Sequence, residues 1–149
     1  MRRSRAYAIF LAGVIALSYP MVGCGGSAEE LLSVPAVDVD ATPLGLTLVG
    51  PRLATQVIAD QSPVIIDVRT PAEFAEGHID GARLIDISSP TFVADIDALN
   101  RTSVYLVYCR SGNRSSVATA QMRELGFDAV YELDGGVIAW SNEGFELVG

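Results

Sequence analysis

The 149-residue sequence predicts an α/β domain in which a mostly parallel sheet is covered by helices on both faces. Its apolar runs, such as 64–68 and 104–108, are continuous and rich in β-branched residues, as is typical of parallel strands buried on both sides. These runs alternate along the chain with segments of helical character, which is the order expected of strand–helix–strand units. The length suits one such domain once a targeting segment is set aside.

The first clearly bounded strand and helix are marked by local signals. The predicted strand over 64–68 is followed by Thr70, a suitable N-cap residue, and by Pro71 at the first helical position. Glu73 lies three residues after Thr70 and completes a capping box. Gly77 then ends a short helix.

The later elements continue the alternation. A helix over 115–125 places Ala118 and Met122 on one face, and Gly126 is its expected C-terminal cap. The other predicted elements are strands over 82–87, 104–108 and 129–133 and helices over 92–99 and 137–142. These segments predict a single domain over 46–149.

Residues 1–23 have the three-part layout of a secretory signal peptide. A basic start is followed by an apolar run over 6–17, and Gly23 supplies a small residue before a cleavage point. The alternative is a transmembrane anchor, but the run is shorter than the roughly 20 residues of a spanning helix, and Pro20 interrupts its continuation. We therefore expect an exported protein.

Cys24 follows directly, and this segment resembles the lipobox of bacterial lipoproteins. The resemblance implies that Cys24 becomes the lipidated first residue of the mature chain, although Met21 stands where leucine is usual. The alternative is a leftover signal-peptide cysteine. Residues 24–45 mix Gly, Pro and acidic residues without periodicity, so we expect a tether to a membrane on its periplasmic or extracellular face.

Composition and charge exclude several classes of partner and site. The chain has 10 Lys and Arg residues against 18 Asp and Glu, for a net charge of −8. An acidic body repels phosphate backbones, so a nucleic-acid partner is not expected. Two cysteines are too few for a disulfide framework or a four-cysteine metal site.

Basic and polar residues surround Cys109, which follows the predicted strand over 104–108. Binding sites in parallel sheets form at the carboxyl ends of the strands. The N–H groups of the next loop, the positive end of the next helix, and Arg110 and Arg114 would all favour the thiolate and lower its pKa.

Gly112 and Asn113 are residue types that accept a positive φ, which would let this loop turn its N–H groups inward. The result would be a cradle for a small anion, built from backbone amides. The alternative is a buried strand-end cysteine with only a packing role. That alternative leaves the two arginines, the glycine and the serines of the loop unexplained.

Five motifs, in this order, resemble the rhodanese-like domain family. They are Asp67-Val-Arg69, Glu73-Phe74, Gly77-His-Ile-Asp-Gly-Ala82, Cys109-Arg-Ser-Gly-Asn-Arg114 and Gly135-Gly-Val-Ile-Ala-Trp140. The resemblance covers residues 46–149 and implies the three-layer α/β fold of that family. It also implies a sulfurtransferase that moves a sulfane sulfur from thiosulfate or a related anion to cyanide or a thiol. That chemistry needs no metal or organic cofactor.

The resemblance also implies a role for each residue of the loop. Cys109 becomes the persulfide site. The substrate-binding cradle consists of Arg110, Ser111, Gly112, Asn113 and Arg114. The two arginines would hold the anionic donor, and Ser115 would support the loop. Asp67 and Arg69 are expected to form a framework ion pair near the site.

Two aromatic residues have competing interpretations. His78 could act as a general base, but no Cys/His pair is adjacent in the sequence, so we expect a structural role in its turn. Trp140 is expected to pack in the core rather than to serve as a stacking platform.

Two other functions are open for the same residues. A persulfide carrier or binding module for a dedicated protein partner would have the same Cys109 loop. A phosphatase or arsenate reductase on this fold is disfavoured. Phosphatases that resemble the fold have one residue more between cysteine and arginine than the four between Cys109 and Arg114.

Overall fold

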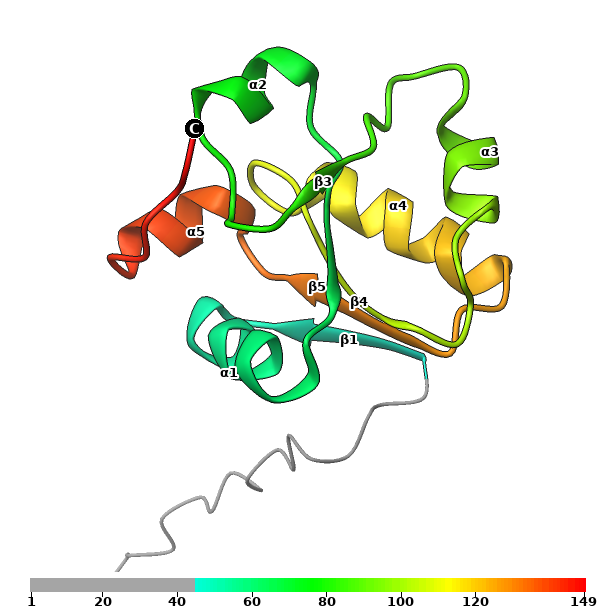
Figure 1. The fold of residues 1–149 in the computed structure, drawn as a ribbon, viewed down its shortest axis with the longest axis horizontal. Helices are drawn as coiled ribbons and strands as arrows, with labels where there is room; N and C mark the ends of the chain where they lie inside the picture. Colours follow the sequence, from blue (N-terminus) through cyan, green and yellow to red (C-terminus); the bar gives the residue numbers. More distant parts are fainter. Residues whose placement is uncertain (1–44) are drawn as a thin grey trace, which may run out of the picture. The chain divides into compact units, whose positions relative to one another are not determined.

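A five-stranded sheet in the order β1-β5-β4-β2-β3 forms the centre of residues 45–149, the part of the chain that the structure describes (Figure 1). The structure is a computed structural model. The strands are β1 (Gly45–Val49), β2 (Val64–Asp67), β3 (Arg83–Leu84), β4 (Val104–Tyr108) and β5 (Ala129–Leu133). All four neighbouring pairs are parallel. The predicted signal peptide over 1–23 and Cys24 lie outside the described residues.

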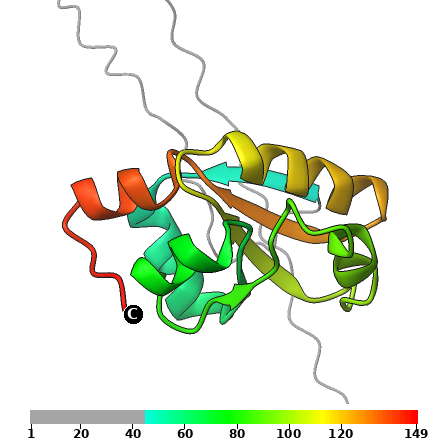
Figure 2. The ribbon, with the colours of Figure 1, turned by 90° about the horizontal axis from the view of Figure 1, so that it is seen from above.

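Helices cover both faces of this sheet, as the sequence predicts. They are α1 (Pro51–Gln61), α2 (Pro71–Glu76), α3 (Phe92–Asp97), α4 (Asn113–Glu124) and α5 (Gly136–Asn142). Figures 1 and 2 show α1 and α5 on one side and α3 and α4 on the other. Within residues 45–149, no helix has the length and apolar character needed to cross a membrane.

Alternate side chains of β4 enter two separate cores. Leu106 and Tyr108 pack with the residues of α1 and α5. Tyr105 and Val107 point to the opposite face and pack with α3 and α4. Cys109 continues this second set, so its side chain lies on the α4 side of the sheet.

The central strands and the α2 boundary agree with the sequence analysis. Strands β4 and β5 have the predicted ends. Thr70 and Glu73 form the capping box, with Pro71 in the first helical turn. Gly77 ends α2, and the expected cap Gly126 follows α4 with a positive φ of 81°.

Several elements differ from the sequence expectation, and the largest differences concern β3, α4, β1 and α1. Strand β3 is shorter than the predicted 82–87 because it pairs with β2 over two residues only. Helix α4 begins at Asn113 rather than at 115, because Gly112 is its N-cap. The sequence analysis predicted neither strand β1 nor helix α1 as a separate element. Strand β1 begins at Gly45, which is the last residue of the predicted tether.

Candidate active site

Cys109 lies at the carboxyl end of β4, where the chain leaves the sheet and turns into α4. The first N–H groups of α5 hold this turn. Val137 donates to the Cys109 carbonyl at 3.0 Å, and Ile138 donates to the Arg110 carbonyl at 3.2 Å. The approach requires glycine at 136, because a Cβ there would lie 2.3 Å from the Cys109 oxygen.

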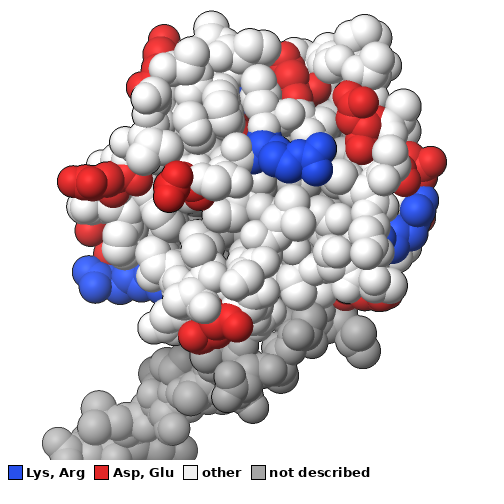
Figure 3. All heavy atoms as spheres, in the orientation of Figure 1, with Lys and Arg blue, Asp and Glu red and all other residues white. Residues whose placement is uncertain are grey.

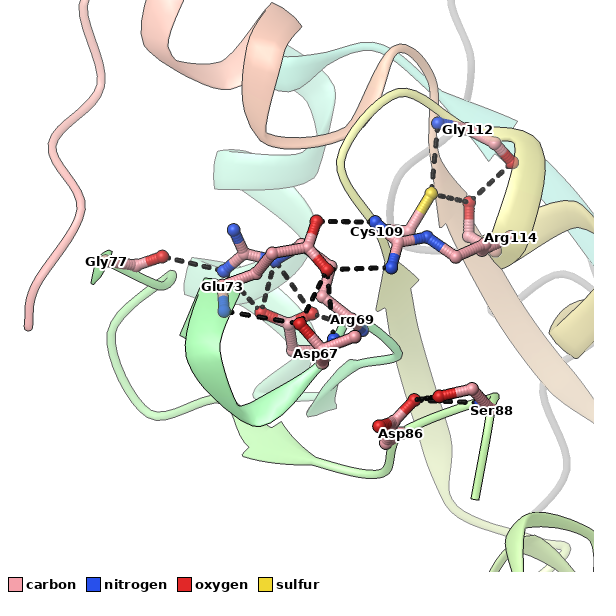
Figure 4. A network of polar contacts seen from close by, with 11 residues as sticks. Asp67, Arg69, Glu73, Gly77, Asp86, Ser88, Cys109, Gly112 and Arg114 are labelled. Atoms are coloured by element: carbon pink, nitrogen blue, oxygen red, sulfur yellow. Dashed lines mark hydrogen bonds and ion pairs between the residues drawn. The ribbon is translucent and has the colours of Figure 1, made fainter. Parts of the chain in front are cut away.

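The sulfur atom of Cys109 is buried and lies within hydrogen-bond distance of a backbone N–H and a hydroxyl group. The residue is 1% exposed, its Sγ accepts from the Gly112 N–H at 3.2 Å, and it lies 3.6 Å from Ser115 Oγ (Figure 4). Burial raises the pKa of the thiol. Hydrogen bonds from the Ser115 hydroxyl and from the N–H groups of Ser115, Ser111 and Gly112 more than offset this, so the pKa lies below that of a free thiol.

Of the two positive φ angles expected in the Cys109 loop, only the one at Gly112 occurs. Gly112 has a φ of 101°, as a turn of N–H groups toward the sulfur requires. The expectation of a positive φ at Asn113 is wrong. Asn113 is the first residue of α4, so the helix itself begins inside the predicted cradle.

The two arginines of the loop have different environments. Arg114 donates two hydrogen bonds to Glu73 of α2, at 2.8 and 2.6 Å. Arg110 is exposed and forms no ion pair within residues 45–149. Arg110 is therefore the guanidinium that can reach an incoming anion, whereas Arg114 is already bound to a carboxylate.

Glu73 is a site residue that the sequence analysis did not connect with the loop. Its Oε2 accepts from the Thr70 N–H at 3.1 Å and from Arg114. The hydrogen bonds from Arg114 lower the pKa of Glu73 to about 2, against the opposing effect of burial. The capping box already explained this carboxylate locally, and no local signal pointed to a partner 41 residues away.

Asp67 and Arg69 form the expected framework ion pair beneath the site. Both are buried, at 0% and 5% exposure, and the closest contact, from Arg69 Nη2 to Asp67 Oδ2, is 2.7 Å. The same nitrogen donates to the Gly77 carbonyl at 2.6 Å. The pair therefore ties the end of β2 to the end of α2, next to Glu73 (Figure 4).

His78 and Trp140 make structural contacts. The His78 ring stacks on Phe74 at 3.8 Å between centroids, and its Nδ1 lies 3.1 Å from the Phe74 carbonyl. Trp140 is 6% exposed and donates from its indole nitrogen to the Glu146 carbonyl at 3.0 Å. These contacts are the ones expected of a turn residue and a core residue.

A cavity of about 410 Å³ opens beside the Cys109 loop. Its charged lining consists of two arginines, Arg69 and Arg110, and two glutamates, Glu73 and Glu76. Val137 and Ile138 of α5 contribute apolar side chains. Its size and mixed lining suit a small polar molecule or the end of a larger one. Residues 45–149 contain no cluster of His, Cys, Asp and Glu that could hold a metal ion.

The fold and the site define a parallel α/β domain with a buried free cysteine in a loop at a strand end. Residues 51–143 match the family described as the rhodanese-like domain, so this chain belongs to that family. A rhodanese-related protein from Thermoplasma volcanium has the same fold. That structure is 28% identical, has a TM-score of 0.62, and the match covers 68% of this chain and 97% of the other.

Several curated relatives are named as sulfurtransferases. Thiosulfate sulfurtransferase GlpE of Pseudomonas putida is 40% identical over 93 residues, which cover 60% of this chain and 80% of that protein. A sulfurtransferase of Allochromatium vinosum is 38% identical over 100 residues, covering 63% and 87%. This chain spans only 29% of the probable adenylyltransferase/sulfurtransferase MoeZ of Mycobacterium tuberculosis, which is 31% identical over 115 residues.

Gly136→Ala tests the close contact between α5 and the Cys109 loop. The added methyl group would overlap the Cys109 carbonyl, so we expect a loss of about 2 kcal/mol or more in the free energy of unfolding and slower alkylation of Cys109. Gly144→Ala is the matched control, since Gly144 also has a positive φ but no atom within 4 Å of its added Cβ. Equal losses in the two variants, measured by urea unfolding, would contradict the proposed packing constraint.

Glu73→Gln tests the ion pair with Arg114. The pKa of Glu73 is lowered by folding, so its stabilisation is present above the ordinary value of 4.5 and is lost as the pH falls toward about 2. We expect the variant to lose about 1–2 kcal/mol at neutral pH, a figure reduced for partial exposure of the pair. Urea unfolding should show this difference shrinking between pH 4.5 and about 2.

Glu143→Gln is the control for that measurement, because Glu143 pairs with Arg52 on an exposed surface. An exposed pair contributes little, so this control should change stability by less than about 1 kcal/mol. If both variants lose the same stability, the Glu73–Arg114 pair has no special role in holding the loop.

Proposed function

We propose that this protein is a sulfurtransferase in which Cys109 carries the transferred sulfur as a persulfide. The observation that supports this most directly is the environment of Cys109 Sγ, where a backbone N–H and a hydroxyl lie at 3.2 and 3.6 Å. These groups stabilise a negatively charged sulfur, both in the Cys109 thiolate and in the persulfide anion that replaces it. Two relatives named as sulfurtransferases support the same chemistry, and the matches cover 80% and 87% of their lengths.

The reaction proceeds in two displacements. The Cys109 thiolate attacks the outer sulfur of thiosulfate, the S–S bond of thiosulfate breaks, and its electron pair leaves with sulfite. Cys109 is then a persulfide anion. In the second step, cyanide or a thiolate attacks the terminal sulfur and the bond electrons return to Cys109. Charge balances in each step, because one anionic nucleophile is consumed and one anionic leaving group is released.

Arg110 is the residue best placed to bind the anionic donor. It is exposed, borders the cavity beside the loop and has no carboxylate partner among the described residues. Arg114 supports the loop through Glu73 and adds positive charge near the Cys109 sulfur. Among the charged side chains on the face in view, Figure 3 shows more acidic than basic ones, so local arginine charge is needed to attract an anion.

We also propose that the protein is exported and anchored to a membrane through a lipid on Cys24. The support is the sequence of residues 1–24 alone, with its basic start, short apolar run and small residue before the cysteine. The acidic and glycine-containing segment that follows would place the domain on the periplasmic or extracellular face. A membrane-extracted chain of intact mass matching residues 24–149 plus acyl groups is the expected result.

Intact-mass measurement before and after treatment with thiosulfate tests the sulfur transfer. The full chain should gain the mass of one sulfur atom, and cyanide should remove it. Cys109→Ser should gain nothing, because the nucleophile is lost. Cys24→Ser is the matched control and should gain the same sulfur as the unmodified chain.

The absence of any gain, in protein whose Cys109 still reacts with an alkylating agent, would contradict direct transfer from thiosulfate. A gain that occurs only from a persulfidated protein donor would identify a carrier for a protein partner. Hydrolysis of an aryl phosphate that is lost in Cys109→Ser would instead indicate a phosphatase.

A further inference from the structure

Glu132 is a buried acidic residue behind the Cys109 loop that the proposed reaction does not use. It lies on β5, is 5% exposed, and follows Val130 by two residues, so it points to the same face of the sheet as Cys109. Its neighbours in register are Val107 of β4 and Leu48 of β1. Burying an ionised carboxylate between apolar strands is costly unless its partners compensate.

The partners of Glu132 are two hydroxyl groups of α4. Ser115 Oγ donates to Glu132 Oε1 at 2.9 Å, and Thr119 Oγ1 donates to Oε2 at 3.2 Å. Within residues 45–149 no arginine or histidine forms an ion pair with it. A carboxylate held only by neutral hydroxyls is therefore built into the core directly behind the reactive loop.

Ser115 connects this carboxylate with the reactive sulfur. Its Oγ lies 3.6 Å from Cys109 Sγ and 2.9 Å from both Glu132 Oε1 and the Gly112 carbonyl. A serine hydroxyl has one hydrogen to donate and two lone pairs that accept. Ser115 can therefore accept a hydrogen bond from the thiol while its one hydrogen is shared between Glu132 and the Gly112 carbonyl, which gives a continuous path from sulfur to carboxylate.

We propose that Glu132 is a positioning residue that acts through Ser115 to take up the proton of the Cys109 thiol. The S–H bond of Cys109 breaks and its proton goes to Ser115 Oγ, while the hydroxyl proton of Ser115 goes to Glu132 Oε1. Cys109 becomes a thiolate, Glu132 becomes a carboxylic acid, and Ser115 is unchanged. No electron enters or leaves the three residues.

The surroundings of the sulfur suit the thiolate that this transfer forms. The negative charge moves from a site with two neutral hydroxyls to a sulfur that receives the Gly112 N–H and lies at the start of α4. After the transfer, the acid proton of Glu132 can donate to Ser115, and Ser115 can donate to the thiolate. The inference rests on the proposed function, since it supplies the thiolate that the first displacement requires.

Few other ionisable groups approach this path. On α4, Arg114 precedes Ser115 and interacts with the Cys109 charge. On β4, Tyr108 points to the opposite face, whereas Tyr105 shares the face of Cys109 and donates its hydroxyl hydrogen to the Asn100 carbonyl. In the loop, Arg110 follows Cys109 and is exposed. After β5, Asp134 is exposed, and β1 and α5 have no ionisable side chain. Arg114 and Asp134 are therefore the charges to control for.

The pH profile of Cys109 alkylation in the full chain tests the relay. Iodoacetamide reacts with the thiolate, and peptide mass spectrometry reads Cys109 separately from Cys24. With the relay, the rate should level off on the acid side, because the proton stays within the pair. In Glu132→Gln the thiol must lose its proton to solvent, so the rate should fall about tenfold per pH unit below the thiol pKa.

Ser115→Ala should lose the same acid-side plateau, and the double variant should show no further effect, because both residues act in one path. Asp134→Asn is the matched control. It also removes one carboxylate charge near the loop, and it should leave the profile unchanged. Circular dichroism of each variant confirms that it is folded.

Parallel profiles for the wild type and Glu132→Gln would overturn the proposal. So would faster alkylation of Glu132→Gln, because that result would mean that Glu132 acts on the thiolate only by charge repulsion. Alkylation does not depend on sulfur transfer. A plateau in a protein that takes no sulfur from any donor would support the relay and contradict the proposed function. Sulfur transfer without a plateau would support the proposed function and contradict the relay.

Discussion

The backbone contact between α5 and the Cys109 loop is the constraint on which the site depends. Two N–H groups of α5 bind the carbonyls of Cys109 and Arg110, and glycine at 136 is what permits that approach. With these carbonyls fixed, the chain turns around them and brings the Gly112 N–H to the sulfur. The Cys109 sulfur is therefore positioned by main-chain packing, and the Arg110 side chain of the loop remains exposed.

Charge at the site is arranged in two layers. The buried Asp67–Arg69 pair joins the ends of β2 and α2, and Glu73 of α2 in turn holds Arg114. Two arginines are therefore committed to the framework, while Arg110 is exposed at the cavity. In a chain with a net charge of −8, this division ties the loop to α2 and leaves the positive charge of Arg110 exposed beside the cavity.

Local sequence signals predicted the elements whose structure is determined locally. The strands β4 and β5, the capping box of Thr70 and the turn at Gly112 all follow from residues close together in the chain. Glu73 and Glu132 show where such reasoning ends. Their partners lie 41 and 17 residues away, and only the folded sheet brings them to the loop. The prediction of a positive φ at Asn113 was wrong for another reason, because Gly112 makes the turn and Asn113 already belongs to α4.

The most direct test of the account is a crystal structure of the protein after exposure to thiosulfate. We predict electron density for one additional atom bonded to Cys109 Sγ, within hydrogen-bond distance of the N–H groups of residues 110–114. The loop backbone and its two contacts with α5 should be unchanged. An unmodified Cys109 with thiosulfate bound elsewhere, or a sulfur added without contact to these N–H groups, would contradict the claim that this loop is built to hold a persulfide.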